Sequence, residues 1–248
     1  MKKFITSILW VLIAFHIYSN KTFEYGNEMY NAQHYNKAIE AFEELINSGI
    51  EDPVVYYNLG NCYFKIQKFP SAILNYEKAL KLDPSNEDAI YNLSLSKGQI
   101  IDKIEELPRF WLSKMLDNIS GLMHSNTWAK VINACLILCL IWIAVFIFSD
   151  RVLVKKIGIL LAALLLLSAF IGYGLGNRQF LKDSTQRFAI VFQENVYIKN
   201  APSQQSSDAF ILHEGTKVEI LDKVGQWLNI KIADGKIGWI KAEGIRAI

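Results

Sequence analysis

Residues 53–86 read PVVYYNLGNCYFKIQKFPSAILNYEKALKLDPSN, and this stretch decides the fold of the first part of the chain. Small, aromatic and helix-ending residues occur in it at set places, namely Tyr56, Leu59, Gly60, Tyr63, Phe64, Ala72, Tyr76, Ala79 and Pro84. A shift of 34 residues toward the N-terminus pairs Gly26 with Gly60 and Phe42 with Tyr76. Small residues let two helices approach closely, and aromatic rings fill the space between them. The pattern predicts two helical-hairpin repeats, at 19–52 and 53–86.

These positions resemble the tetratricopeptide family, which implies an α-helical solenoid. A third unit begins at Glu87, but Ser94 stands where the earlier units have glycine, and no second helix of the pattern follows. We therefore expect a capping helix over 87–107, which completes a repeat domain at 20–107. Asp102, Glu105 and Glu106 are interpreted as a solvated face of that helix.

The first helices of the repeats should line a concave face. By their place in the repeat, the candidate binding residues are Asn27, Tyr30, Asn31, Tyr57, Asn61, Phe64, Lys65 and Tyr91. Aromatic and amide side chains can hold a short extended peptide or a partner helix. Tyr57 and Phe64 could equally hold neighbouring repeats together. An acidic C-terminal peptide is not expected, because a carboxylate clamp needs several cations and this face offers Asp88 and little besides Lys65.

Two stretches, 131–148 and 157–175, contain no charged residue over about the thickness of a bilayer. We predict a transmembrane hairpin with helices at 128–149 and 157–176, joined by a loop at 150–156. Buried core helices are the alternative, although such helices normally have a polar face. The second helix carries Ser168, Gly172 and Gly176, which would let another helix approach, either the first span or a helix of a partner.

The N-terminus has the order of a secretory signal, because Lys2 and Lys3 precede an apolar run that ends near residue 15. We assign 1–19 to a signal peptide; an uncleaved anchor is the alternative, and both would export the repeat domain. The predicted loop carries Arg151, Lys155 and Lys156, and short basic loops stay in the cytoplasm. We therefore expect a multi-pass protein of the bacterial inner (cytoplasmic) membrane with both soluble domains on the periplasmic, extracytoplasmic side.

Residues 108–127 separate the repeats from the first span. Leu112, Leu116 and Ile119 recur at helical spacing. This pattern favours an amphipathic helix at the membrane interface, with a second cap on the solenoid as the alternative. A linker is expected at 177–187.

Residues 188–248 alternate polar and apolar residues in short runs broken by turns. The segments 196–202, 214–215, 225–227 and 235–240 resemble the bacterial SH3 family, which implies an all-β SH3-like barrel that binds cell-wall peptides or braces neighbouring domains. Lys199 stands where that family usually has arginine. Trp227 and Trp239 are either an exposed ligand platform or core residues.

Composition disfavours several classes of function. The formal net charge is +2, the segment 20–107 holds eight Lys against fourteen Asp and Glu, and 188–248 holds seven charges of each sign. A nucleic-acid partner is therefore not expected. The histidines and the three cysteines show neither metal-ligand spacing nor a nucleophilic arrangement, so we predict no metal, no cofactor, no catalytic residue and no enzyme activity.

The order of these parts along the whole chain resembles the BatE-like proteins of the aerotolerance (Bat) operon family of Bacteroidetes. That resemblance implies partners among membrane and periplasmic proteins, including the von Willebrand-type Bat proteins, in an envelope complex. The predicted function is a membrane-anchored scaffold for protein–protein interaction. The alternative is a sensor that reads cell-wall peptides through its SH3-like domain.

Overall fold

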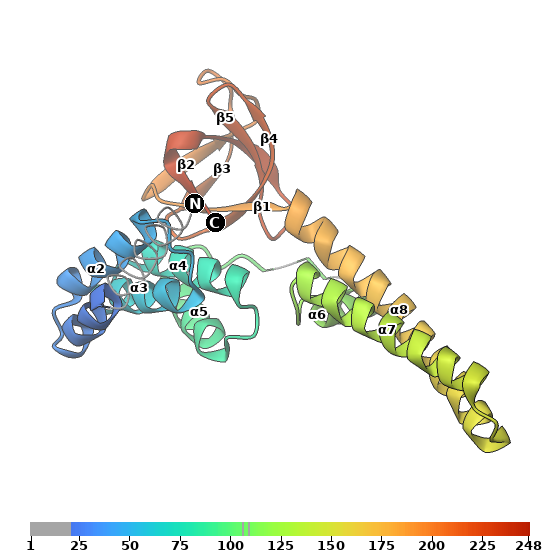
Figure 1. The fold of residues 1–248 in the computed structure, drawn as a ribbon. Helices are drawn as coiled ribbons and strands as arrows, with labels where there is room; N and C mark the ends of the chain where they lie inside the picture. The colour runs from blue at the N-terminus through green and yellow to red at the C-terminus, as the bar shows by residue number, and fades with distance from the viewer. Residues whose placement is uncertain (1–20, 106, 109) are drawn as a thin grey trace, which may run out of the picture. The chain divides into compact units, whose positions relative to one another are not determined.

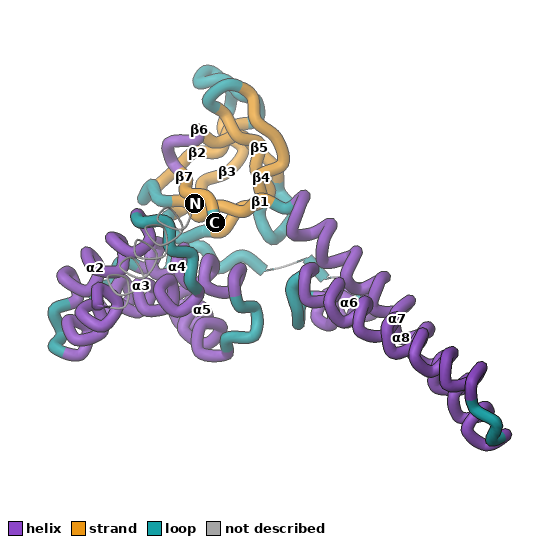
Figure 2. The backbone as a smooth tube through the Cα atoms, in the orientation of Figure 1, coloured by secondary structure: helices purple, strands orange, loops and turns teal. Residues whose placement is uncertain are grey.

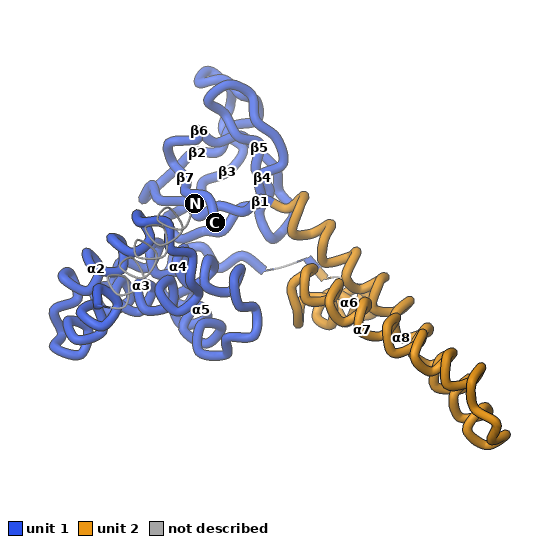
Figure 3. The backbone as a smooth tube through the Cα atoms, viewed as in Figure 1, with its two compact units in different colours: residues 1–107, 187–248 blue, residues 108–186 orange. Residues whose placement is uncertain are grey.

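The computed structural model describes residues 21–105, 107–108 and 110–248 (Figure 1). The predicted signal segment lies outside the described residues. The chain divides into two compact units, one formed by Met1–Leu107 with Arg187–Ile248 and the other by Pro108–Gln186 (Figure 3). The second unit is thus an insertion between two halves of the first.

The helical half of the first unit is a run of paired helices (Figure 2). Residues 21–31 are helical and are followed by α2 (Tyr35–Asn47), α3 (Pro53–Lys65), α4 (Phe69–Leu82) and α5 (Glu87–Gln99). The Asp52 side chain caps α3 by accepting from the Val54 N–H, and the Asn86 side chain caps α5 by accepting from the Ala89 N–H. The helices between residues 21 and 99 therefore fit the expected helical-repeat architecture.

The two repeats share the same packing, 34 residues apart. A Cβ built on Gly26 would lie 2.8 Å from the Phe42 ring, and one on Gly60 would lie 2.7 Å from the Tyr76 ring. Gln33 and Gln67, which turn the chain between the helices of each pair, have positive φ angles of 62° and 60°. The repeated glycines are required because the aromatic rings leave no space for a side chain.

The Gly60→Ala variant should lower the stability of the repeats by about 1–3 kcal/mol, because the new methyl group overlaps the buried Tyr76 ring. Gly98→Ala is the matched control, since a Cβ at Gly98 in α5 meets nothing within 4 Å, and alanine favours the helix. Thermal unfolding followed by circular dichroism should show a lower midpoint for Gly60→Ala and an equal or higher one for Gly98→Ala. Equal loss in both variants would contradict the packing argument.

The β half forms one antiparallel sheet in the order β3-β2-β6-β5-β4-β1-β7. Its strands are β1 (Arg187–Val191), β2 (Asn195–Lys199), β3 (Asp208–His213), β4 (Lys217–Val224), β5 (Trp227–Lys231), β6 (Ile237–Lys241) and β7 (Ile245–Ala247). The expected closed barrel is wrong, because β3 and β7 are edges of the sheet. At the end of β3, the His213 N–H donates a hydrogen bond to the Asp102 carboxylate, at 2.7 Å, instead of to a neighbouring strand.

The two halves of the first unit share an apolar cluster. Ile73 of α4, Leu93 of α5 and Ile190 of β1 pack together, with Ile100 and Phe192 at the border of the cluster. Beside it, the Glu77 carboxylate lies 2.9 Å from the Lys97 Nζ of α5 and 2.6 Å from the Lys217 Nζ of β4. Burial alone would raise the pKa of Glu77, but Lys217 and Lys97 hold it below its usual value.

The segment after α5 attaches the helices to the sheet, which corrects the expected capping helix. The helix ends at Gln99, and Asp102 then accepts from the Thr216 hydroxyl at 2.6 Å and lies 2.6 Å from the His213 Nδ1. Ile104 packs against the apolar core of the sheet. Asp102 is therefore a joint between the two halves and not part of a solvated helix face.

Asp102→Asn should destabilise the first unit by about 1–2 kcal/mol, because an amide cannot accept from every donor that the carboxylate accepts from. Burial would raise the pKa of Asp102, but the bonds from Thr216 and His213 lower it. Since the folded pKa lies below the unfolded one, this stability is complete above the unfolded pKa and is lost as the pH falls through the folded pKa. The loss of stability caused by Asp102→Asn should accordingly become smaller at acidic pH.

The control is Glu105→Gln, because the Glu105 side chain is exposed. Urea unfolding at neutral pH should distinguish the two variants. A Glu105→Gln loss as large as that of Asp102→Asn would count against the joint.

The inserted unit contains α6 (Trp111–Ser120), α7 (Ser125–Phe148) and α8 (Val152–Thr185). Both α7 and α8 are long and apolar enough to cross a membrane. The helices differ from the expected spans, since the connection is reduced to 149–151, and the predicted linker after 176 is helical as far as Thr185. Lys155 and Lys156 lie in the first turns of α8 instead of in a loop, because lysine is compatible with a helix and α8 contains no proline.

Small residues of α8 pack against α7. Gly158, Ala162, Ala169, Gly172 and Gly176 are buried, and a Cβ on Gly176 would lie 2.9 Å from the Trp128 Cβ. Ser168 departs from the expectation, because it is exposed and its hydroxyl donates to the Leu164 carbonyl of its own helix. These buried residues follow one another at steps of four, seven, three and four residues, which keeps them on one face of the helix, and Ser168 does not share that face.

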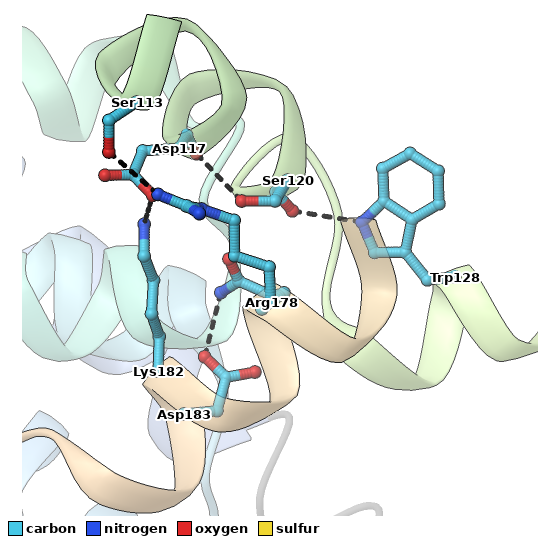
Figure 4. Close-up of polar contacts among 8 residues, drawn as sticks. Ser113, Asp117, Ser120, Trp128, Arg178, Lys182 and Asp183 are labelled. Atoms are coloured by element: carbon cyan, nitrogen blue, oxygen red, sulfur yellow. Dashed lines mark hydrogen bonds and ion pairs between the residues drawn. The ribbon is translucent and has the colours of Figure 1, made fainter. Parts of the chain in front are cut away.

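A cluster around Asp117 fastens α6 to the end of α8 (Figure 4). The Asp117 Oδ1 lies 2.7 Å from the Arg178 Nε and 2.6 Å from the Lys182 Nζ, and the Arg178 Nη2 donates to the Ser113 hydroxyl at 2.9 Å. Burial would raise the pKa of Asp117, but the bonds from Arg178 and Lys182 lower it. In the same cluster the Trp128 Nε1–H donates to the Ser120 carbonyl.

Candidate functional site

The first helices of the two repeats line a cavity of about 340 Å³. Its lining residues are Asn27, Tyr30, Asn31, Asn58 and Asn61. Helix 21–31 contributes three of these side chains and α3 contributes two. We call this cavity the asparagine groove. Its lining contains no charged side chain, and its polar groups are amides and one phenol.

Hydrogen bonds hold the groove amides in set orientations. The Asn58 Nδ2 donates to the Asn27 Oδ1 at 3.0 Å. The Asn61 Oδ1 accepts twice, from the Tyr76 hydroxyl at 2.7 Å and from the Asn92 Nδ2 at 2.9 Å. Within the described residues, the amide N–H groups of Asn27 and Asn61 have no hydrogen-bond partner. These donors are therefore available to a ligand, and their carbonyl oxygens are already used.

Four of the predicted binding residues come together in this groove: Asn27, Tyr30, Asn31 and Asn61. Tyr91 is 63% exposed on α5, and Lys65 is exposed outside the lining. Tyr57 and Phe64 are partly buried in the cluster that joins the helices to the sheet, so both also hold the repeats together. The Phe64 ring, near the end of α3, lies 5.8 Å from the Phe69 ring at the start of α4.

Sequence reasoning missed Asn58 and Asn92. The signal was present, because Asn58 lies one helical turn before Asn61, and Asn92 lies 31 residues after it, the same separation as from Asn27 to Asn58. A residue at these places faces the first helix of the neighbouring repeat. A spacing of 31 residues between asparagines, in addition to the 34-residue repeat, could therefore have predicted the amide-to-amide hydrogen bonds between repeats.

The two tryptophans of the sheet, for which a ligand platform and a place in the core were the alternatives, differ in exposure. Trp227 is only 8% exposed, and Trp239 is half-buried. Strand register places Asn229 opposite Trp239, and the Asn229 Oδ1 is a buried oxygen without a hydrogen-bond partner in the described part of the chain. A stacking surface needs exposed rings, so Trp227 does not fit that role.

The described residues contain no group of three His, Cys, Asp or Glu side chains that could hold a metal ion. Cys62 is fully buried, and burial raises the pKa of its thiol to about 12. Such a thiol is a poor nucleophile and a poor ligand.

The curated proteins that the chain matches are much longer than the matched part. The chain is 39% identical over 62 residues to the Hsp70-Hsp90 organizing protein of Triticum aestivum, which covers 25% of this chain and 11% of that protein. It is 32% identical over 74 residues to sperm-associated antigen 1 of Rattus norvegicus, which covers 30% of this chain and 8% of that protein. The chain thus spans about a tenth of the length of these relatives.

Among solved structures, the Arabidopsis OM64 TPR domain is 23% identical with a TM-score of 0.32, and the match covers 33% of this chain and 67% of that one. The TPR2B domain of yeast Sti1 in its pHsp70 complex is 25% identical with a TM-score of 0.31, over 32% of this chain and 63% of that one. Family models match at residues 53–86, as a tetratricopeptide repeat, and at residues 194–246, as a bacterial SH3 domain. The chain therefore contains a tetratricopeptide repeat and a bacterial SH3 domain, two modules typical of protein–protein interaction.

Proposed function

We propose that this protein is a membrane-anchored scaffold that holds an extended segment of a partner protein in the asparagine groove. The observation that carries the proposal is the pair of unpartnered amide N–H groups on Asn27 and Asn61 within the described residues. An extended peptide presents backbone carbonyl oxygens along its length, and fixed amide donors suit them without regard to sequence. Because the lining is uncharged, the segment need not end in a carboxylate or carry acidic residues.

Chain connectivity supports the anchor. The chain leaves the first unit at Leu107 and re-enters it at Arg187, and the two halves of that unit are packed together. If the inserted helices cross a membrane, they must cross it an even number of times, and α7 and α8 supply two crossings. The basic connection around Arg151 then favours the cytoplasmic side for the hairpin turn and the extracytoplasmic side for both modules.

The short helix α6 fits the membrane interface. Phe110, Trp111 and Leu122, which lie at the two ends of α6 and precede α7 in the chain, are more than half exposed, while Asp117 of α6 is tied to α8. Exposed aromatic rings next to the end of a span are typical of the headgroup region. We take envelope proteins as the partners, of the kind found in complexes of the aerotolerance type. A wall-peptide sensor is the less supported reading, since Trp227 is buried.

The groove can be tested by photo-crosslinking in the native membrane. A benzoylphenylalanine placed at Tyr30 should capture a defined partner segment, and the same probe at the exposed Lys65, outside the lining, should not. The captured segment, synthesised with both ends blocked, should bind the purified full-length protein in saturable fashion. Asn27→Ala with Asn31→Ala should weaken this binding about tenfold, since each lost hydrogen bond contributes about 0.5–1.5 kcal/mol. Equal capture at both probe positions would refute the groove as the site.

Membrane sidedness can be tested by cysteine labelling of intact cells with an impermeant maleimide. Glu87→Cys in α5 and Lys223→Cys in the sheet are exposed positions of the first unit and should both be labelled, whereas Asp150→Cys in the hairpin turn should be labelled only after permeabilisation. Native Cys62 should not be labelled, because its side chain is fully buried. Opposite labelling of Glu87→Cys and Lys223→Cys would exclude a two-crossing hairpin between them.

A further inference from the structure

A second cavity, of about 330 Å³, lies away from the asparagine groove and is lined by residues of α2, α3, α4 and β7. Both halves of the first unit contribute to it, since Lys78 comes from the helical repeats and Arg246 from the last strand. We call it the junction pocket. It shares no lining residue with the asparagine groove.

Part of the wall of the junction pocket is apolar. Ile46, Leu59 and Leu74 line it, and the last two side chains are buried. The Tyr56 ring lies beside them, with the Lys78 Nζ 5.5 Å from its centroid. This wall can receive a branched aliphatic side chain, which gains free energy by leaving water.

The pocket also carries two cations, Lys78 and Arg246. Among the described residues, neither Lys78 nor Arg246 forms an ion pair, although Arg246 stacks over the Phe192 ring at 4.2 Å. A third cation nearby, Lys81, is already engaged, because its Nζ donates to the Ile248 carbonyl at 2.8 Å. Burial, Lys81 and Arg246 together lower the pKa of Lys78, and the charge of Glu51 partly opposes this. Like charges held together in a half-buried site favour an anion between them.

The acid of the pocket, Glu43, is hydrogen-bonded to a tyrosine. Glu43 accepts from the Tyr63 hydroxyl at 2.5 Å and forms no ion pair with Lys78 or Arg246 in the described structure. The pocket therefore offers an aliphatic wall and a pair of cations within one cavity. A main-chain carboxylate on an apolar residue presents both matching groups on a single Cα atom.

We propose that the junction pocket binds the free C-terminal carboxylate of a partner polypeptide that ends in an aliphatic residue. The carboxylate lies at Lys78 and Arg246, and the terminal side chain lies against Leu59 and Leu74. The site differs from the asparagine groove in place and in chemistry, because the groove is uncharged and takes the middle of an extended segment.

The test uses full-length protein in lipid nanodiscs and the peptide Gly-Ser-Gly-Ser-Leu, tagged with fluorescein at its N-terminus. Fluorescence anisotropy should show saturable binding of the free-carboxylate peptide, with binding of the C-terminally amidated peptide at least about tenfold weaker, as expected for loss of a charge-assisted contact. Exchange of the terminal Leu for Ser should also weaken binding. Equal binding of the acid and the amide would overturn the proposal.

Variants locate the site. Lys78→Met and Arg246→Met should each reduce binding of the acid peptide about tenfold or more, while Lys223→Met, an exposed lysine on the sheet, should leave it unchanged. Lys78→Met should melt at or above the wild-type midpoint, because repulsion among Lys78, Lys81 and Arg246 is relieved. Unchanged binding in both pocket variants would refute the site.

Two controls distinguish this proposal from a general anion site and from binding in the asparagine groove. Inorganic phosphate should not displace the peptide at equal concentration, and if it does, the pocket is a general anion site without a requirement for an aliphatic residue. Asn31→Ala in the asparagine groove should not change binding of the acid peptide, and loss of binding in that variant would place the peptide in the groove instead.

Discussion

The Glu77 carboxylate lies between two lysines, one from the helical half of the first unit and one from the sheet, and the arrangement of these two halves depends on that contact. Lys97 belongs to the helical repeats and Lys217 to the sheet, so the carboxylate is fully paired only when the two halves are packed. Taking a carboxylate out of water is costly, and paired cations offset most of that cost without a large net gain. Stabilisation of the joint therefore comes mainly from the apolar cluster of Ile73, Leu93 and Ile190, while Glu77 restricts how the surfaces can meet.

The joint lies where the repeats end. In a repeat solenoid, each second helix covers the helices before it, and α5 has no such helix after it in the described part of the chain. The strand β1 packs against α4, and Ile190 lies with Leu93 of α5, so the sheet covers part of the surface that a further helix would cover. The sheet, through β1, therefore packs on the helical half beside α4 and α5.

Because the two halves of the first unit are joined, the chain leaves that unit for the inserted hairpin and returns to the same unit. Its two ends start and finish in one packed unit, which is a geometric constraint that charge counting does not provide. Within the hairpin, buried small residues bring α8 close to α7, and Asp117 ties α6 to the polar end of α8. The two units are thereby connected by two chain segments instead of one.

Local patterns in the sequence determined the repeats, the apolar helices and most strands. The Gly60 and Tyr76 pair, the 34-residue spacing and the charge-free stretches each follow from contacts between residues close in the chain, so periodicity reports them. Tertiary structure decided the rest. From the sequence, Asp102 is interpreted as an exposed acid of a helix, but in the structure it accepts hydrogen bonds from His213 and Thr216 of the sheet. The sequence also assigns Ser168 to the stripe of small residues, but in the structure its side chain is exposed. The open sheet, the junction pocket and the burial of Trp227 likewise arise from contacts between segments far apart in sequence, which no local pattern records.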